Sequence, residues 1–172
     1  AARARGVPVY AQTSCQPLSL SFTLDHAYIL KTVSPWPATD EPAELRTIFA
    51  DPSFRAAIRQ SLRTYDPKRI FNGRWDRMDV TRAALPKNAG LEGRTIAEIA
   101  AEQGRDPVDV FFDLGLEENF QTIFTGRILN NEEDAVGKML TNDGVLISLS
   151  DAGAHNTFLC DAGYAMYLYG RW

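Results

Sequence analysis

The residues best suited to chemistry follow an apolar run late in the chain, in the segment GVLISLSDAGAH, residues 144–155. The run is typical of a short strand covered on both faces, as in a parallel α/β sheet. It stops at Asp151, and small residues then lead to His155. A carboxylate and an imidazole are therefore expected at the carboxyl edge of a sheet, where α/β folds collect their active sites. In the alternative interpretation Asp151 only caps the next helix and His155 is an ordinary loop residue.

Composition narrows the class of protein. A chain of 172 residues, 45% hydrophobic and 23% charged, is enough for one globular domain with a sizeable core. The net charge of −4 and the pI near 5.2 give no electrostatic reason to expect nucleic acid or an anionic membrane as partner. Cys15 and Cys160 are too few for a disulfide framework, and no apolar run has transmembrane length. We therefore expect a cytoplasmic protein.

Both ends of the sequence have the pattern of interrupted helices. AARARG resembles the last turn of a helix, with cations near its end and Gly6 at the usual C′ position. Residues 162–172 are rich in aromatic residues and helix-like. We expect the chain to begin and end inside structural elements of a longer protein.

The first part of the chain is predicted to hold one short strand and a long irregular segment. Residues 7–12 are β-prone and follow the expected helix end, an order typical of α/β proteins. Residues 13–37 are polar and marked by prolines around an apolar stretch, which predicts an irregular excursion with one short helix. Asp51 and Pro52 form a helix start, and the apolar spacing predicts a helix to about Tyr65.

Helix signals are clearer in the second half. Thr95 and Glu98 have capping-box spacing, Gly104 ends that helix, and Asp106 begins another before a proline. The other expected elements are strands over residues 75–80 and 120–125 and a helix, NEEDAVGKMLTN, capped by Asn130 or Asn131.

Strand and helix units with polar residues at the strand ends are typical of a barrel or a doubly wound sheet. An eight-stranded barrel needs about 250 residues. A chain of 172 residues, spent largely on an excursion and helices, has room only for the last strands and helices. The predicted fold class is therefore α/β, a partial (β/α)8 TIM-like barrel.

Three segments carry a resemblance to a known family: GRTIAEIAAEQGRDPVDVFFDL, NNEEDAVGKML and GVLISLSDAGAH. In order and spacing they resemble the carboxyl part of the barrel in N-acyl-D-amino-acid deacylases, the D-aminoacylase-like members of the amidohydrolase superfamily. The upstream ARARGVPVYAQTS is similar to the helix and seventh strand of that barrel. The resemblance implies that residues 16–90 are an inserted, mainly helical, lid-like segment after strand seven.

The resemblance also implies roles for individual residues. Asp151 matches the acid that ends the eighth strand, lies at the metal, here zinc, and acts as general acid/base. Such a carboxylate takes the proton of a zinc-bound water and hands it to the leaving amine, which an amide group cannot do. Tyr10 and Ser14 are the hydroxyls near the seventh strand, and His155 follows the acid. These three are expected to bind a small-molecule amide substrate, although Gln12 departs from the family's tyrosine-rich pattern.

The amino-terminal metal ligands of the superfamily have no counterpart in this sequence. Its first-strand His-x-His is missing, and the two histidines present, His26 and His155, lie far apart. One carboxylate cannot hold a catalytic zinc, which takes about three protein ligands. We therefore expect a missing amino-terminal part of the barrel to complete the site, the isolated chain to be inactive, and His26 to be an ordinary, partly exposed residue.

A second interpretation is a non-enzymatic α/β interaction module. In that case Trp36, Trp75 and neighbouring aromatic residues form a partner-binding surface, because exposed apolar patches mark interfaces. Cys15 and Cys160 are expected to be buried apolar residues in either interpretation. The sequence leaves the oligomeric state and the acyl and amine preferences open.

Zinc titration tests the missing-ligand prediction. Because Asp151 is the one implied ligand, we expect the isolated chain to bind zinc more weakly than about 1 μM, which corresponds to roughly −8 kcal/mol. Titration calorimetry measures this, with Asp151→Asn as the matched control. Tighter binding that survives in the variant would reveal a zinc site that the sequence does not predict.

Overall fold

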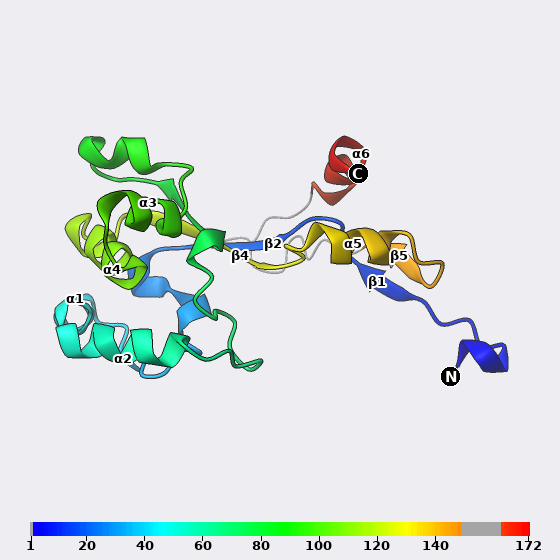
Figure 1. Ribbon diagram of the computed structural model, residues 1–172, viewed down its shortest axis with the longest axis horizontal. Coiled ribbons are helices and arrows are strands. Elements are labelled where there is room, and N and C mark those ends of the chain that lie inside the picture. The colour runs from blue at the N-terminus through cyan, green and yellow to red at the C-terminus, as the bar shows by residue number, and fades with distance from the viewer. Residues whose placement is uncertain (1, 149–162) are drawn as a thin grey trace. The chain divides into compact units, whose positions relative to one another are not determined.

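The computed structural model describes residues 2–148 and 163–172, which form a mixed α/β protein (Figure 1). The chain divides into two compact units. The strand unit combines Ala1–Ser19 with Arg127–Trp172, and the helical unit is Leu20–Gly126. Within the described residues the strands form one two-stranded and one three-stranded sheet and close no barrel. The α/β class is confirmed, and the barrel stays a prediction.

In its described residues, the strand unit holds two parallel strands and two α-helices. Its elements are η1 (Arg3–Arg5), β1 (Ala11–Thr13), α5 (Glu133–Leu140), β5 (Val145–Ile147) and α6 (Tyr164–Arg171). A helical turn does precede Gly6, whose φ of 76° is the left-handed conformation that glycine adopts readily. The strand expected over residues 7–12 starts later, at Ala11.

The helical unit is built around the three-stranded sheet, in the order β2-β4-β3. The strands of this sheet are β2 (Leu18–Phe22), β3 (Met78–Arg82) and β4 (Ile123–Leu129), and β3 pairs with β4 in antiparallel fashion. Residues 18–19 of β2 and 127–129 of β4 are counted with the strand unit. The α-helices of the helical unit are α1 (Pro42–Ala50), α2 (Pro52–Leu62), α3 (Ile96–Gln103) and α4 (Pro107–Glu117). Short 3-10 turns are η2 (Leu24–His26), η3 (Tyr28–Leu30), η4 (Trp75–Arg77) and η5 (Pro86–Leu91). Among the helices that the structure describes, none has the length and apolar character to cross a membrane.

The predicted helix starts are confirmed by their capping contacts. Asp51 and Asp106 each accept a hydrogen bond of 2.8 Å from a backbone N–H of the following first turn. Thr95 and Glu98 form the reciprocal capping box, and Gly104 ends α3 with a φ of 61°. These contacts satisfy N–H groups that have no partner inside the helix.

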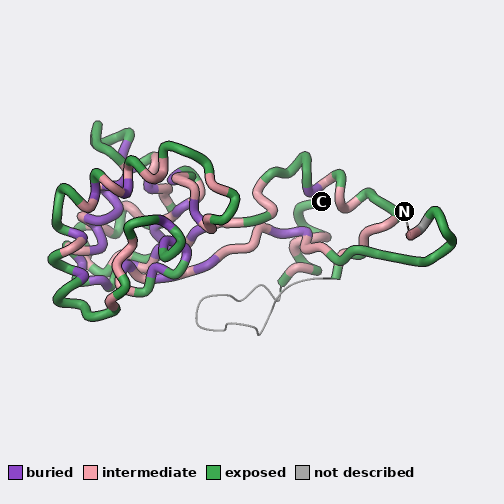
Figure 2. Tube along the Cα trace, turned by 90° about the horizontal axis from the view of Figure 1, so that it is seen from below, coloured by how far each residue is buried: buried purple, intermediate pink, exposed green. Residues whose placement is uncertain are grey.

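Helix α4 is the centre of the helical unit, because its apolar side chains point in several directions. The Phe111 ring lies 4.7 Å from that of Phe124 on the sheet side. The Phe112 ring lies 5.1 Å from that of Phe49, at the end of α1. Other rings in the two aromatic clusters are those of Phe22, Trp36, Phe54 and Trp75. Figure 2 shows that most of the buried positions of the described chain, drawn in purple, lie in the helical unit.

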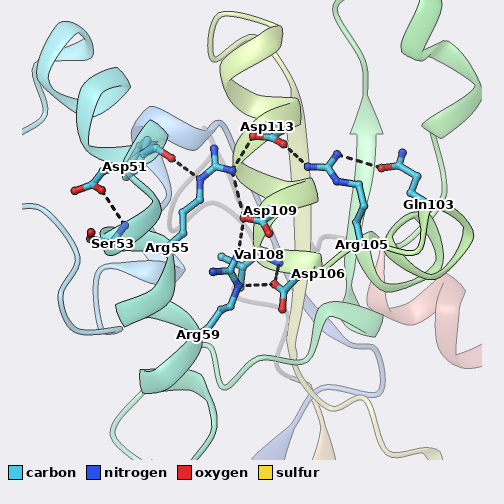
Figure 3. Close-up of polar contacts among 11 residues, drawn as sticks. Asp51, Ser53, Arg55, Arg59, Gln103, Arg105, Asp106, Val108, Asp109 and Asp113 are labelled. Carbon is cyan, nitrogen blue, oxygen red and sulfur yellow. Dashed lines mark hydrogen bonds and ion pairs between the residues drawn. The ribbon is translucent and has the colours of Figure 1, made fainter.

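Ion pairs join α2 to α4 along their facing sides (Figure 3). Arg55 contacts Asp113 at 2.7 Å and Asp109 at 3.3 Å, and Arg59 contacts Asp106 at 3.1 Å as well as Asp109. The spacing of these residues puts each set on one helix face. Arg55 is buried, and its Nε also donates to the Phe49 carbonyl at 2.7 Å. The network therefore fixes both the end of α1 and the position of α2.

Two regular elements differ from the sequence prediction. Leu18–Phe22 is a strand, because Leu, Ser, Leu, Ser and Phe alternate between the core face and the opposite face. The predicted excursion with one short helix was wrong there. Helix Pro42–Ala50 was not predicted, although Glu41 and Pro42 repeat the acid-proline start.

Further differences concern strand boundaries, a helix cap and burial. The expected strand over residues 75–80 begins at Met78, and the one over 120–125 is shifted to Ile123–Leu129. Neither Asn130 nor Asn131 caps α5, since its N-cap is Glu132, which makes no side-chain cap bond. Strand β5 is not covered on both faces in this chain, because Leu146 is 48% exposed.

The buried carboxylate of Glu118 ties the end of α4 to the loop before η5. It accepts hydrogen bonds from the backbone of Ala84 at 2.7 Å and of Leu85 at 3.1 Å, and from the side chains of Asn88 at 2.9 Å and Thr122 at 2.7 Å. Burial by itself raises the pKa of Glu118, but these donors outweigh it and the pKa lies below its usual range.

We expect Glu118→Gln to lower the free energy of unfolding at pH 7 by about 1–3 kcal/mol, because the amide leaves buried N–H donors without an acceptor. The carboxylate stabilises the fold above the ordinary pKa of Glu, and this stabilisation is lost as pH falls through the lowered pKa of the folded state. The difference between the two proteins should therefore shrink below about pH 4. Urea unfolding at several pH values measures it.

Glu102→Gln is the matched control, because Glu102 forms an exposed ion pair with Arg94. Such pairs contribute about 0–1 kcal/mol. An equal loss in both variants, or a difference that does not change with pH, would contradict the role of Glu118.

Candidate functional site at the carboxyl edge of the parallel strands

Strands β1 and β5 are parallel and in register, with Ala11 opposite Val145 and Thr13 opposite Ile147. The Ser148 N–H continues the ladder by donating to the Thr13 carbonyl at 3.3 Å. The carboxyl ends of two strands far apart in sequence therefore meet at one edge. Ser14 and Ser148 are the first residues beyond that edge.

Helix α5 completes a strand–helix–strand arrangement in the strand unit. It lies in the connection from β1 to β5 and packs on β5. Parallel strands need such a crossover because a tight turn cannot join them. In Figure 1, β1, β5 and α5 lie together, as these contacts require.

Residues 14–16, which we call the strand-end loop, are held by side chains from other parts of the strand unit. The Asn130 amide donates to the carbonyls of Ser14 and Gln16, each at 3.4 Å. The Ser14 hydroxyl lies 3.3 Å from both the N–H and the carbonyl of Gln16. Asn130 has a φ of 54°, a left-handed conformation that Asn tolerates better than most residues.

Cys15 is buried at the centre of this loop, as predicted, with 1% of its surface exposed. Its thiol donates to the Tyr164 carbonyl at 3.1 Å, and its own carbonyl accepts the Trp172 indole N–H at 3.0 Å. Burial raises the pKa of the Cys15 thiol. The thiol is therefore a packed hydrogen-bond donor rather than a reactive group.

The structure places the predicted site residues in different parts of the chain. Ser14 lies at the carboxyl edge, but Tyr10 precedes β1 and is 52% exposed. Because a strand rises about 3.3 Å per residue, these two hydroxyl-bearing residues are about 13 Å apart and the structure does not bring them together. Asp151 and His155 lie outside the described residues, as does Cys160.

His26 lies in the helical unit and is exposed, as predicted for an ordinary residue, with its Nε2 3.9 Å from Asp25. Among residues 2–148 and 163–172 no group of three potential metal ligands from His, Cys, Asp and Glu is clustered. The described part of the carboxyl edge offers hydroxyl and amide groups. Such groups can orient a polar small molecule by hydrogen bonds.

Two residues of this region were missed by the sequence prediction. Asn130 was assigned to a helix cap, whereas its amide crosses to the strand-end loop. The local sequence, two Asn residues before an acidic helix turn, favours a left-handed conformation at Asn130. It does not indicate that the Asn130 amide binds the distant strand-end loop. Trp172 carried no sequence signal for its hydrogen bond to Cys15.

The fold and the described part of the site define an α/β protein with a parallel strand pair. The chain is 28% identical over 111 residues, 63% of its length, to uncharacterized proteins of Mycobacterium bovis and of two strains of Mycobacterium tuberculosis. The matched region is 18% of the length of each relative, so the chain spans less than a fifth of these proteins. No protein-family model and no solved structure matches.

Asn130 provides a test of how the strand-end loop is held. We expect Asn130→Ala to lower the free energy of unfolding by about 1–3 kcal/mol, because a left-handed φ strains alanine and the amide hydrogen bonds are lost. Asn130→Gly relieves the strain and should recover about 1 kcal/mol of that loss. Urea unfolding followed by circular dichroism measures both. Equal stability of the wild type and the alanine variant would contradict the assignment.

Proposed function

We propose that this chain is the carboxyl-terminal part of a (β/α)8 barrel in a metal-dependent amidohydrolase. The complete enzyme would resemble N-acyl-D-amino-acid deacylases and hydrolyse the amide C–N bond of an N-acyl-D-amino acid. The observation that carries the proposal is the parallel, in-register pairing of β1 with β5, with α5 in their connection. Consecutive strands of a (β/α)8 barrel have this relation.

The exposure of the strand pair supports further strands in the complete protein. Parallel sheets are normally covered on both faces by helices. Leu146 of β5 is 48% exposed, and Val9 just before β1 is 49% exposed. Two strands do not form a stable sheet by themselves. A barrel supplies the neighbouring strands and helices, and the greater length of the mycobacterial relatives is consistent with it.

The helical unit fits the proposed lid-like insertion, with wider boundaries than the sequence predicted. It has its own aromatic core, and it interrupts the connection between β1 and α5. Helices α3 and α4 belong to it, because α1 and α2 both pack on α4. We therefore extend the proposed insertion from residues 16–90 to Leu20–Gly126.

Ser14 and Asp151 are assigned to the carboxyl edge in this proposal. Ser14 follows β1 directly and would bind the substrate through its hydroxyl, and Asp151 lies a few residues beyond β5. A carboxylate at that position can accept the proton of the attacking water and donate it to the leaving amine. His155 is kept as a substrate-binding candidate, and Tyr10 is a weaker one because it lies at the other end of β1.

The described residues of the edge do not by themselves fit a zinc site. Zinc is held by thiolate, imidazole and carboxylate groups. Ser14 and Asn130 supply a hydroxyl and an amide, and the Cys15 thiol is a buried donor to a carbonyl. In the proposal the zinc ligands other than Asp151 come from the amino-terminal part of the barrel.

The alternative of an interaction module finds less support. Trp75 is only 8% exposed and packs on Phe71 and Phe111, so it belongs to the core rather than to a surface. Trp36 is half-buried, with its ring 5.2 Å from that of Phe49. Trp75 therefore contributes no exposed aromatic surface, and Trp36 contributes only part of its ring.

Replacement of Asp151 in the complete enzyme tests the proposal. We expect Asp151→Asn to reduce kcat for an N-acyl-D-amino acid by at least about 100-fold, because the amide cannot carry the proton. The value of KM should change much less, since the side chain keeps its size. Steady-state kinetics with the D- and L-substrates, together with metal analysis, measures this.

Asp143→Asn is the matched control, because Asp143 is an exposed acid just before β5, at its opposite end. It should retain wild-type kcat. If Asp151→Asn also kept wild-type kcat with full metal content, Asp151 would have no part in the mechanism. The helix-cap interpretation predicts that outcome, because Asn caps about as well as Asp.

A further inference from the structure

The two ends of helix α6 form hydrogen bonds with Cys15 of the strand-end loop, one with its backbone carbonyl and the other with its thiol. The Trp172 indole N–H donates to the Cys15 carbonyl at 3.0 Å, and the Cys15 thiol donates to the Tyr164 carbonyl at 3.1 Å. Tyr164 begins α6 and Trp172 follows its last residue. The helix is thus tied at both ends to Cys15, between Ser14 and Gln16.

The same helix is also tied to α5. Arg171 forms an ion pair with Glu133 in the first turn of α5. One turn further along, Gly137 allows the Trp172 ring to approach closely, since a Cβ built on Gly137 would lie 3.3 Å from Cζ3 of that ring. The indole therefore lies against α5 while its N–H reaches the strand-end loop.

We propose that α6 is a latch on the strand-end loop, with Trp172 as the positioning residue that fixes the Cys15 carbonyl. The loop carbonyls of Ser14 and Gln16 accept hydrogen bonds from Asn130, and the indole N–H holds the carbonyl between them, that of Cys15. The consequence for substrate recognition rests on the proposed function. The latch itself does not.

Helix α6 can open because it buries little apolar surface. Met166 and Tyr169 are 77% and 85% exposed, so little apolar surface holds the helix down. Elements with few buried contacts open locally before the protein unfolds. Opening of α6 would free the Cys15 carbonyl and uncover the Cys15 thiol.

Thiol labelling of the chain measures this opening directly. Cys160→Ser is used as the background in every protein, so that a reagent such as 5,5′-dithiobis(2-nitrobenzoic acid) reports on Cys15 only. In the latched state Cys15 is 1% exposed, and we expect labelling at least about 10-fold slower than that of the urea-unfolded chain at the same pH. Labelling of the folded chain at the unfolded rate would overturn the proposal.

The decisive variant is Trp172→Phe, which keeps an aromatic ring but removes the N–H donor. Losing one hydrogen bond should speed labelling of Cys15 by about fivefold. Tyr169→Ala is the matched control in the same helix and should leave the rate unchanged, since that side chain is exposed.

Urea unfolding of each variant separates local opening from a loss of global stability. The latch would be overturned if Trp172→Phe left the labelling rate of Cys15 unchanged. It would also be overturned if the labelling rate rose only by the factor by which the variant raises the population of globally unfolded protein. In the complete enzyme, the latch predicts that Trp172→Phe raises KM more than it lowers kcat. Absence of any amidohydrolase activity in the wild type would count against the proposed function alone, because labelling of Cys15 does not depend on activity.

Discussion

The parallel pairing of β1 with β5 is the constraint on which the strand unit depends. A parallel ladder cannot be closed by a tight turn, so the intervening chain must leave one end of β1 and return to the other end of β5. Helix α5 makes the last part of that return and packs on β5. The long interval between the strands is occupied by the helical unit, which packs as a separate compact unit. The strand-end loop is the point at which the chain leaves β1.

The helical unit is held by two kinds of interaction that meet on α4. Phe111 faces the three-stranded sheet and Phe112 faces α1, so neighbouring positions of one helix fill two aromatic clusters. Burial of this apolar surface supplies the main driving force. Arg55 then fixes the angle at which α2 lies, because its guanidinium contacts α4 and the end of α1 at once. Its neighbour Asp113 has a lowered pKa, since hydrogen bonds from arginines outweigh the effect of burial.

The strand-end loop owes its conformation to residues that are distant in sequence. Asn130 holds two of its carbonyls and Trp172 holds the third. A loop fixed in this way presents the Ser14 hydroxyl in a defined direction, which the proposed substrate binding would require. Its order depends on the segment between β4 and α5, which carries Asn130, and on the end of α6, which carries Trp172.

The sequence by itself determined the elements whose signals are local: the helix starts at Asp51 and Asp106, the Thr95 capping box and the strand before Ser148. Each depends on residues within one turn or on a short periodic pattern. Only the tertiary structure decided that β1 lies beside β5, that Asn130 and Trp172 hold the strand-end loop, and that Trp75 is buried. Pairing, burial and long-range hydrogen bonds depend on which distant segments meet in space. No local pattern in a single sequence records that choice.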